Sequence, residues 1–298
     1  MLAFLVLSTH IYALIGTNDI VLPLRLPYEI DETTRISNAE KEVYASLHLV
    51  KGSIGGDYDL YARKDFITNE GTIEDVEKQK ILQAKEISTM SKFNHPNIIK
   101  FYTWDRTDHL FFFMEWCYRD VINFMDNDQF SLHKLSVDIL KALSYLHGLG
   151  YAHLDIKPDN ILACLGNDEI TYKLTDFGFT LKSEKSSSVV GTLGYLPPEM
   201  IEGVSRRTVS RTYNTFKADI FSFGATIGKL ADILHPKMTL RNDRYICFQD
   251  HELASPLSHA SSKSRILVDF VQQATKCDPK ARPTINQLLK HRYISEIL

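Results

Sequence analysis

The chain has 298 residues, with 34 Lys and Arg against 37 Asp and Glu and a formal net charge of −3. This balance gives no reason to expect nucleic acid or an anionic membrane surface as the main partner. Hydrophobic residues at 44% and charged residues at 24% are typical of a globular protein and exclude extensive disorder. The length suits one large domain, or one domain divided into two lobes.

The spacing of the cysteines argues against a metal site or a disulfide framework. No two of them have CxxC spacing, and no His cluster lies beside them. They are Cys117, Cys164, Cys247 and Cys277. Reduced thiols are therefore the default, which favours the cytoplasm or the nucleus.

Residues 1–15 are apolar apart from Ser8, Thr9 and His10. This segment is too short and too interrupted to span a bilayer. A signal peptide usually starts with positive charge, whereas the first basic residue here is Arg25. A strand or helix packed on the domain, or an incorrect start, is favoured over a secretory signal at residues 1–16. Residues 1–27 form an N-terminal extension without an assigned role, and no membrane span is expected elsewhere.

The first half of the chain is predicted to be rich in strands. Residues 43–50 and 60–66 are rich in β-forming side chains and flank the glycine-rich segment 52–56, which predicts an enlarged β-hairpin. Residues 73–93 show the periodicity of a helix, and residues 111–116 form a further apolar strand.

The second half is predicted to be helical. Apolar residues over 132–146 recur at helical spacing, and residues 219–230 are apolar on nearly all sides, as in a buried helix. A short β-hairpin is predicted from residues 161–164 and 172–174. Strands first and helices second, joined near residues 116–119, indicate an α+β domain of two lobes with a ligand cleft between them.

Polar residues flank the predicted hairpin at its open end. One side is the segment His-Leu-Asp-Ile-Lys-Pro-Asp-Asn at residues 153–160, and the other is Asp-Phe-Gly at residues 176–178. The hairpin would bring Asn160 and Asp176 close together. Amide and carboxylate oxygens are ligands that Mg²⁺ prefers. A magnesium site is therefore predicted at this end of the hairpin.

Six segments, in this order and spacing, resemble the motifs of eukaryotic-type protein kinases. The two just described resemble the catalytic loop, with Leu154 in place of the usual Arg, and the metal-binding tripeptide. The Ala-Arg-Lys at residues 62–64 resembles the strand that carries the nucleotide-binding Lys, and residues 191–199 resemble the end of the activation segment. Residues 219–224 resemble the buried central helix, and residues 277–283 resemble the late Arg motif. The resemblance covers residues 28–298 and implies the bilobal kinase fold. Its N-lobe would be residues 28–116 and its C-lobe residues 117–298, with ATP bound between them.

The resemblance also implies the roles of the catalytic residues. Asp155 would accept the proton of the substrate hydroxyl, and Lys157 would neutralise charge on the transferred phosphoryl group. Thr192 would contact both. Asn160 and Asp176 would bind Mg²⁺.

ATP is implied to contact residues of both lobes. Lys64 would reach the α- and β-phosphates and pair with Glu86 on the following helix. The other predicted nucleotide contacts are Ile36, Val43, Ala62, Met114, Glu115, Cys117, Leu162 and, for the ribose or the substrate, Asp120.

Ser/Thr specificity is implied by Lys157, two residues after Asp155, and by Thr192. The expected activity is therefore transfer of phosphate from ATP to a protein Ser or Thr. Glu199 and Arg282 are expected to pair in a platform for protein substrates, which disfavours a small-molecule kinase. The sequence does not indicate the substrate or the oligomeric state.

The sequence departs from the family pattern at two places, and the first of them keeps an alternative function open. Residues 36–42 occupy the place of the glycine-rich phosphate loop but contain no Gly and carry Glu40 and Glu42. The glycines at 52–56 are too close to Lys64 to replace that loop. A pseudokinase or scaffold is therefore the alternative. Leu154 also removes an Arg that commonly binds an activation-loop phosphate, so this loop is expected to need no phosphate.

Overall fold

The computed structural model describes residues 20–35, 45–67, 72–166, 169–205, 212–233 and 262–296. The chain divides into two compact units between Tyr118 and Arg119. We call residues 20–118 the first unit and residues 119–296 the second unit.

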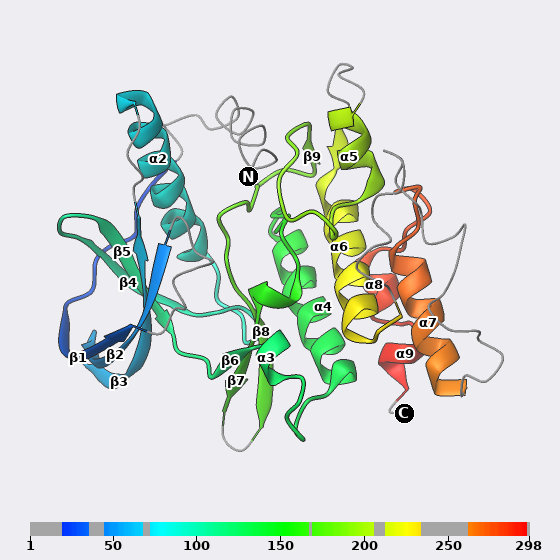
Figure 1. The fold of residues 1–298 in the computed structure, drawn as a ribbon, viewed down its shortest axis with the longest axis horizontal. Coiled ribbons are helices and arrows are strands. Elements are labelled where there is room, and N and C mark those ends of the chain that lie inside the picture. Colours follow the sequence, from blue (N-terminus) through cyan, green and yellow to red (C-terminus); the bar gives the residue numbers. More distant parts are fainter. Residues whose placement is uncertain are drawn as a thin grey trace. The chain divides into compact units, whose positions relative to one another are not determined.

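The first unit is built on a five-stranded antiparallel sheet, drawn in Figure 1, with the strand order β1-β2-β3-β5-β4. The strands are β1 (Tyr28–Arg35), β2 (Ala45–Ile54), β3 (Asp57–Phe66), β4 (Phe101–Arg106) and β5 (Leu110–Glu115). Helix α2 (Ile73–Met90) follows β3 and begins with a capping box between Thr72 and Asp75. The predicted helix and three strands are confirmed, whereas β1 and β4 were not predicted.

The hairpin between β2 and β3 is tight, so the predicted enlarged hairpin is wrong. Ile54 pairs with Asp57, which leaves only Gly55 and Gly56 in the turn. Their φ angles of 62° and 96° are those that a two-residue turn of this handedness requires and that glycine adopts without strain. Gly52 lies inside β2 and pairs with Asp59.

Gly52 leaves no room for a side chain, because a Cβ atom there would collide with the carbonyl oxygen of Glu29 on β1. We expect Gly52→Ala to destabilise the protein by about 1–3 kcal/mol through overpacking. Urea unfolding measures this, with Ser53→Ala on the same strand as the control. An unchanged midpoint for Gly52→Ala would contradict the close approach of β1 to β2.

An aromatic core fills one face of this sheet. Val50, Ile54, Tyr61, Phe111 and Phe113 are buried there, and Tyr28, Ile30 and Tyr102 pack against them. The chain preceding β1 is tied to the same unit, because the indole nitrogen of Trp104 donates to the carbonyl of Pro23 at 2.8 Å. Part of the predicted N-terminal extension is therefore fixed to β4.

The second unit contains a small sheet and most of the helices. The sheet has the order β6-β7-β8, and a separate pair joins β9 to β10. The strands are β6 (Arg119–Asp120), β7 (Ile161–Leu165), β8 (Ile170–Leu174), β9 (Lys185–Ser186) and β10 (Tyr213–Asn214). The helices are α3 (Val121–Phe124), α4 (Leu132–Gly148), α5 (Pro198–Ser205), α6 (Thr215–Leu230), α7 (Ser262–Ala274), α8 (Ile285–Leu288) and α9 (Arg292–Ser295). The predicted α+β class is confirmed.

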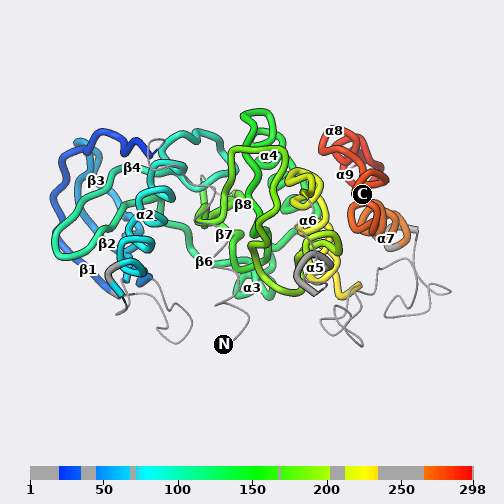
Figure 2. Tube along the Cα trace, turned by 90° about the horizontal axis from the view of Figure 1, so that it is seen from above, coloured from blue at the N-terminus to red at the C-terminus, as the bar shows by residue number. Residues whose placement is uncertain are grey.

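Helix α6 lies between α4 and α7, as Figure 2 shows, and contacts both. It is buried from Ala218 to Gly228, as its apolar sequence predicted. Asn214 caps its N-terminus by accepting a hydrogen bond from the backbone N–H of Lys217. A short 3-10 helix (Pro158–Asn160) leads into β7. Within the described residues, we find no helix that combines the length and the apolar character needed to cross a membrane.

Candidate functional site

The loop at residues 153–160 is anchored to the buried helix α6 by Asp219. The Asp219 side chain is fully buried, and its carboxylate accepts backbone N–H groups of His153 and Leu154, both at 2.8 Å. His147 donates to the same carboxylate at 2.9 Å. Leu154 has a φ of 67°, a conformation that costs a non-glycine residue about 1–3 kcal/mol. The bonds to Asp219 therefore hold a strained backbone, and His153 further donates to the carbonyl of Thr175 after β8.

A closed polar network surrounds Asp155. Its Oδ1 accepts the Thr192 hydroxyl at 2.7 Å, and its Oδ2 lies 2.9 Å from Asn160 Nδ2 and 3.0 Å from Lys157 Nζ. Lys157 also donates to the Thr192 hydroxyl oxygen at 2.8 Å. Asp155 is 5% exposed, so these donors replace most of the water that a carboxylate would otherwise bind. The result is a buried anion held in one orientation by three side chains.

Asn160 and Asp176 flank the open end of the β7–β8 hairpin, as predicted. The two segments meet through the backbone N–H of Thr175, which donates to the carbonyl of Asn160 at 3.0 Å. The Asn160 amide nitrogen is used on Asp155, which leaves its amide oxygen as the acceptor. Asp176 has a φ of 63°, a conformation that Asp tolerates better than most residues. The amide oxygen and the carboxylate suit a hard cation such as Mg²⁺.

The first unit carries a buried Lys–Glu ion pair. Lys64 on β3 donates to Glu86 on α2 at 2.9 Å, and the side chains are 17% and 7% exposed. The pair joins residues 22 apart in sequence, and it is the pair that the sequence motifs implied. Two other predicted nucleotide contacts, Ile36 and Val43, lie outside the described residues, as does the glycine-free segment 36–42.

The remaining predicted contacts lie on strands of the two units. In the first unit Ala62 pairs with Met114, and both are buried. In the second unit Leu162 pairs with Asp120. The Asp120 carboxylate caps α3 by accepting the backbone N–H of Asn123 at 2.9 Å. Sequence reasoning missed this structural task, although an Asp just before a short helix is a capping signal.

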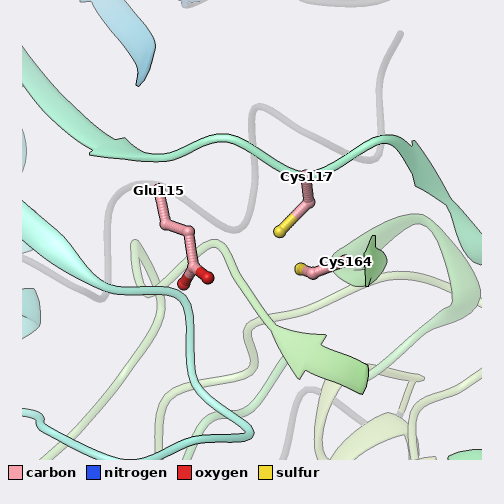
Figure 3. Close-up of side chains that lie close together, drawn as sticks. All are labelled: Glu115, Cys117 and Cys164. Atoms are coloured by element: carbon pink, nitrogen blue, oxygen red, sulfur yellow. The ribbon is translucent and has the colours of Figure 1, made fainter. Parts of the chain in front are cut away.

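Figure 3 shows Glu115, Cys117 and Cys164. Glu115 ends β5, Cys117 lies two residues later, and Cys164 is on β7 in the second unit. None of the described cysteines is a free thiol, because Cys117, Cys164 and Cys277 each take part in a disulfide. The expectation of reduced thiols is therefore wrong, because it rested on the spacing of the cysteines in the sequence alone.

The activation segment that follows Asp176 is paired with the chain just before α6. Strand β9 pairs with β10, the Tyr213 hydroxyl donates to the carbonyl of Ser188 at 2.6 Å, and Thr215 N donates to the carbonyl of Glu184 at 3.0 Å. Leu154, at the position where the resemblance implies a phosphate-binding Arg, is 3% exposed. The bonds made by Tyr213 and Thr215 tie the described part of this segment to the chain around the start of α6. Sequence reasoning missed the pairing, because strands of two residues carry no periodic signal.

Tyr213→Phe should loosen this segment. The substitution removes the bond to the Ser188 carbonyl from a buried site, which we expect to cost about 1 kcal/mol. Limited proteolysis should then cut residues 183–190 faster than in the parent. Tyr58→Phe is the matched control, because the Tyr58 hydroxyl also donates a short bond, to Asp31, but at an exposed site. Equal cleavage rates for parent and Tyr213→Phe would contradict the expected role of the bond.

A buried ion pair closes the end of the segment. Arg282, whose side chain is 0% exposed, donates to the two Glu199 oxygens at 2.6 and 2.7 Å. It also donates to the backbone carbonyls of Lys217, Lys276 and Cys277. The expected pairing of Glu199 with Arg282 is therefore present, and its burial makes it more than a surface ion pair.

These features define a class of protein. A buried carboxylate bonded to Lys, Asn and Thr, a loop anchored to a buried helix, and a Lys–Glu pair beside an antiparallel sheet are the parts of a kinase domain. The comparison of sequences agrees, because the family model "Protein kinase domain" matches residues 53–294. The chain belongs to the protein kinase domain family, and the resemblance and the kinase fold inferred from the motifs are confirmed.

The relatives that the comparison finds are named as protein kinases. Serine/threonine-protein kinase dst2 of Dictyostelium discoideum is 30% identical over 266 residues, which is 85% of this chain and 21% of the relative. Serine/threonine-protein kinase dst1 of the same organism is 29% identical over 265 residues, 85% of this chain and 33% of the relative. Serine/threonine-protein kinase 1 of Arabidopsis thaliana is 27% identical over 282 residues, which is 89% of this chain and 32% of the relative. The chain thus spans about a fifth to a third of the length of these relatives.

Proposed function

We propose that this chain is an ATP- and Mg²⁺-dependent protein Ser/Thr kinase, which transfers the γ-phosphoryl group of ATP to a protein hydroxyl. The observation that carries the proposal is the network around Asp155. It combines a proton acceptor with a cation, Lys157, that lies 3.0 Å from it. Family membership and the names of the relatives support the same activity.

The chemistry assigned to each residue follows from its position. The substrate hydroxyl oxygen bonds to the γ-phosphorus while the bond from that phosphorus to the bridging oxygen breaks, and ADP leaves with the electron pair. Asp155 takes the hydroxyl proton. Lys157 balances the charge on the transferred group. Thr192, bonded to both, fixes their relative orientation.

The other assignments concern ATP and its metal. Asn160 and Asp176 would hold Mg²⁺, which neutralises phosphate charge, and Lys64, oriented by Glu86, would bind the α- and β-phosphates. The adenine contacts are proposed to be Ile36, Val43, Ala62, Met114 and Leu162, backbone groups of Glu115 and Cys117, and Asp120 for the ribose or the substrate. The pseudokinase alternative rests on the glycine-free segment 36–42 alone, whereas the Asp155 network is complete.

The test is phosphate transfer from radiolabelled ATP to a degenerate peptide library with Ser, Thr or Tyr as the acceptor. We expect labelling of Ser and Thr peptides that EDTA abolishes and added Mg²⁺ restores. Asp155→Asn prepared in parallel excludes a contaminating kinase. A folded protein that binds no ATP and labels no peptide would overturn the proposal and favour a scaffold. Labelling confined to Tyr peptides would overturn the Ser/Thr assignment.

A further inference from the structure

Lys229 is an unusual residue of the buried helix α6. It lies on the last turn, after a run of buried side chains, and is itself only partly buried. Its ammonium nitrogen lies 3.7 Å from the centre of the Tyr195 ring, a close cation–π contact. The same nitrogen would lie 3.0 Å from a Cβ atom placed on Gly194. Lys229 therefore lies directly against the end of the activation segment.

The charge of Lys229 has no counter-ion among the residues that the structure describes, since none of their carboxylates comes within 4.0 Å of its ammonium group. Burial lowers the Lys229 pKa, and the negative charge of Asp159 opposes that shift. By contrast, Lys157 lies 3.0 Å from Asp155 and Lys134 lies 3.3 Å from Asp138. A partly desolvated cation that no carboxylate contacts directly gains more from an arriving anion than a fully hydrated cation does.

The position of Lys229 places this cation beside the proposed reaction centre. Tyr195, on which it stacks, is bonded through its backbone N–H to the carbonyl of Thr192 at 3.1 Å. Burial raises the Tyr195 pKa to about 12, with further contributions from the charges of Asp159 and Asp155. Tyr195 thus stays neutral at physiological pH and is near both carboxylates. Lys229 lies against the same ring.

We propose that Lys229 selects protein substrates that carry an anionic side chain, either a carboxylate or a phosphate, close to the acceptor hydroxyl. This inference rests on the proposed kinase function and names its substrate class. Asp159 acts in the opposite sense, by attracting basic residues. Because Asp159 is exposed, water and salt screen it, whereas Lys229 is partly shielded. The charge of Lys229 is therefore expected to dominate at the substrate position that reaches Tyr195.

A purely structural role predicts a different behaviour. A cation in the last turn of a helix, stacked on a Tyr ring, stabilises the fold through the helix dipole and the ring. Loss of such a contact would lower activity on every peptide by the same factor. A role in selection changes the ratio of activities between acidic and neutral peptides. The ratio of kcat/KM values is thus the quantity to measure.

The experiment uses Ser peptides in which each flanking position in turn is Ala, Glu, phosphoserine or Lys. For the parent we expect one position at which Glu or phosphoserine raises kcat/KM about tenfold over Lys. Lys229→Met should bring the Glu-to-Ala ratio close to one at that position, and Lys229→Glu should favour Lys. Lys141→Met, which removes an exposed Lys from α4, is the control and should keep the parent ratio.

The outcomes separate the two proposals. Transfer to no peptide at all would overturn the kinase function, and this inference with it. Transfer without an acidic preference, or a preference that survives in Lys229→Met, would overturn the inference and leave the kinase function standing. If Lys229→Met does not fold, Lys229→Gln serves as the neutral variant and Lys229→Arg should keep the preference. A preference for phosphoserine but not Glu would assign the phosphate as the group selected.

Discussion

Asp155→Asn should reduce the rate of phosphoryl transfer by about 10²- to 10⁴-fold, the usual effect of removing a general base. An amide cannot take the proton of the substrate hydroxyl. It also cannot accept hydrogen bonds at both ends, although the Thr192 hydroxyl donates to one oxygen and Asn160 and Lys157 approach the other. One of these donors must therefore turn away, which disturbs the orientation of the remaining groups.

The measurement is single-turnover transfer from ATP to the best peptide of the library. ATP affinity, measured separately by calorimetry, should change little, because Asp155 is not assigned to the nucleotide. Asp126→Asn removes an exposed carboxylate from the same unit and should behave like the parent. Full activity in Asp155→Asn would show that the proton acceptor lies elsewhere and that the role assigned to this network is wrong.

Arg282→Leu should destabilise the protein by about 3–5 kcal/mol, because removing one partner of a buried ion pair leaves the other charge without compensation. Here the loss includes both bonds to Glu199 and those to the carbonyls of Lys217, Lys276 and Cys277. The guanidinium carbon lies 4.9 Å from the centre of the Phe221 ring, and Leu can still pack against that ring although it loses the cation–π contact. Most of the cost is therefore electrostatic.

Urea unfolding of the single and double variants isolates the pair. In Glu199→Gln/Arg282→Leu the uncompensated carboxylate is gone, so the double variant should be more stable than the sum of the two single losses implies. Arg292→Leu is the matched control, since Arg292 pairs with Glu296 at an exposed site and its loss should barely move the midpoint. Strictly additive losses at Glu199 and Arg282 would contradict a coupled pair.

Elements with a long periodic pattern could be predicted from the sequence. Helices α4 and α6 follow from runs of apolar residues whose spacing depends on nearby residues only. Strand β1 was missed because Tyr28–Arg35 is mostly polar, and it is defined by its pairing with β2. The hairpin was predicted, but its turn was expected to be longer than it is, because residues 52–56 were treated as one loop. Gly52 instead serves the close approach of a neighbouring strand.

The residues of the candidate site were predicted from motifs that resemble those of kinases, and not from the periodicity of apolar residues. No local rule joins Lys64 to Glu86, or Asp155 to Thr192 37 residues later, so these pairs depended on the resemblance to kinases. The sequence analysis did not single out Lys229, although a Lys within an apolar helix is an unusual residue that can be recognised from the sequence. Its meaning depends on Tyr195, which the fold brings to it from 34 residues away. A contact between two residues so far apart in the chain cannot be predicted from their spacing in the sequence.

The pairing of β9 with β10 has a consequence for chain entropy. Fixing the backbone of one residue costs about 1–2 kcal/mol, so a segment that orders only when a signal arrives must meet that cost at every activation. In this chain the Tyr213 and Thr215 bonds are made within the folded unit, and the cost is met once, as the unit folds. A signal acting here would have to release order rather than create it.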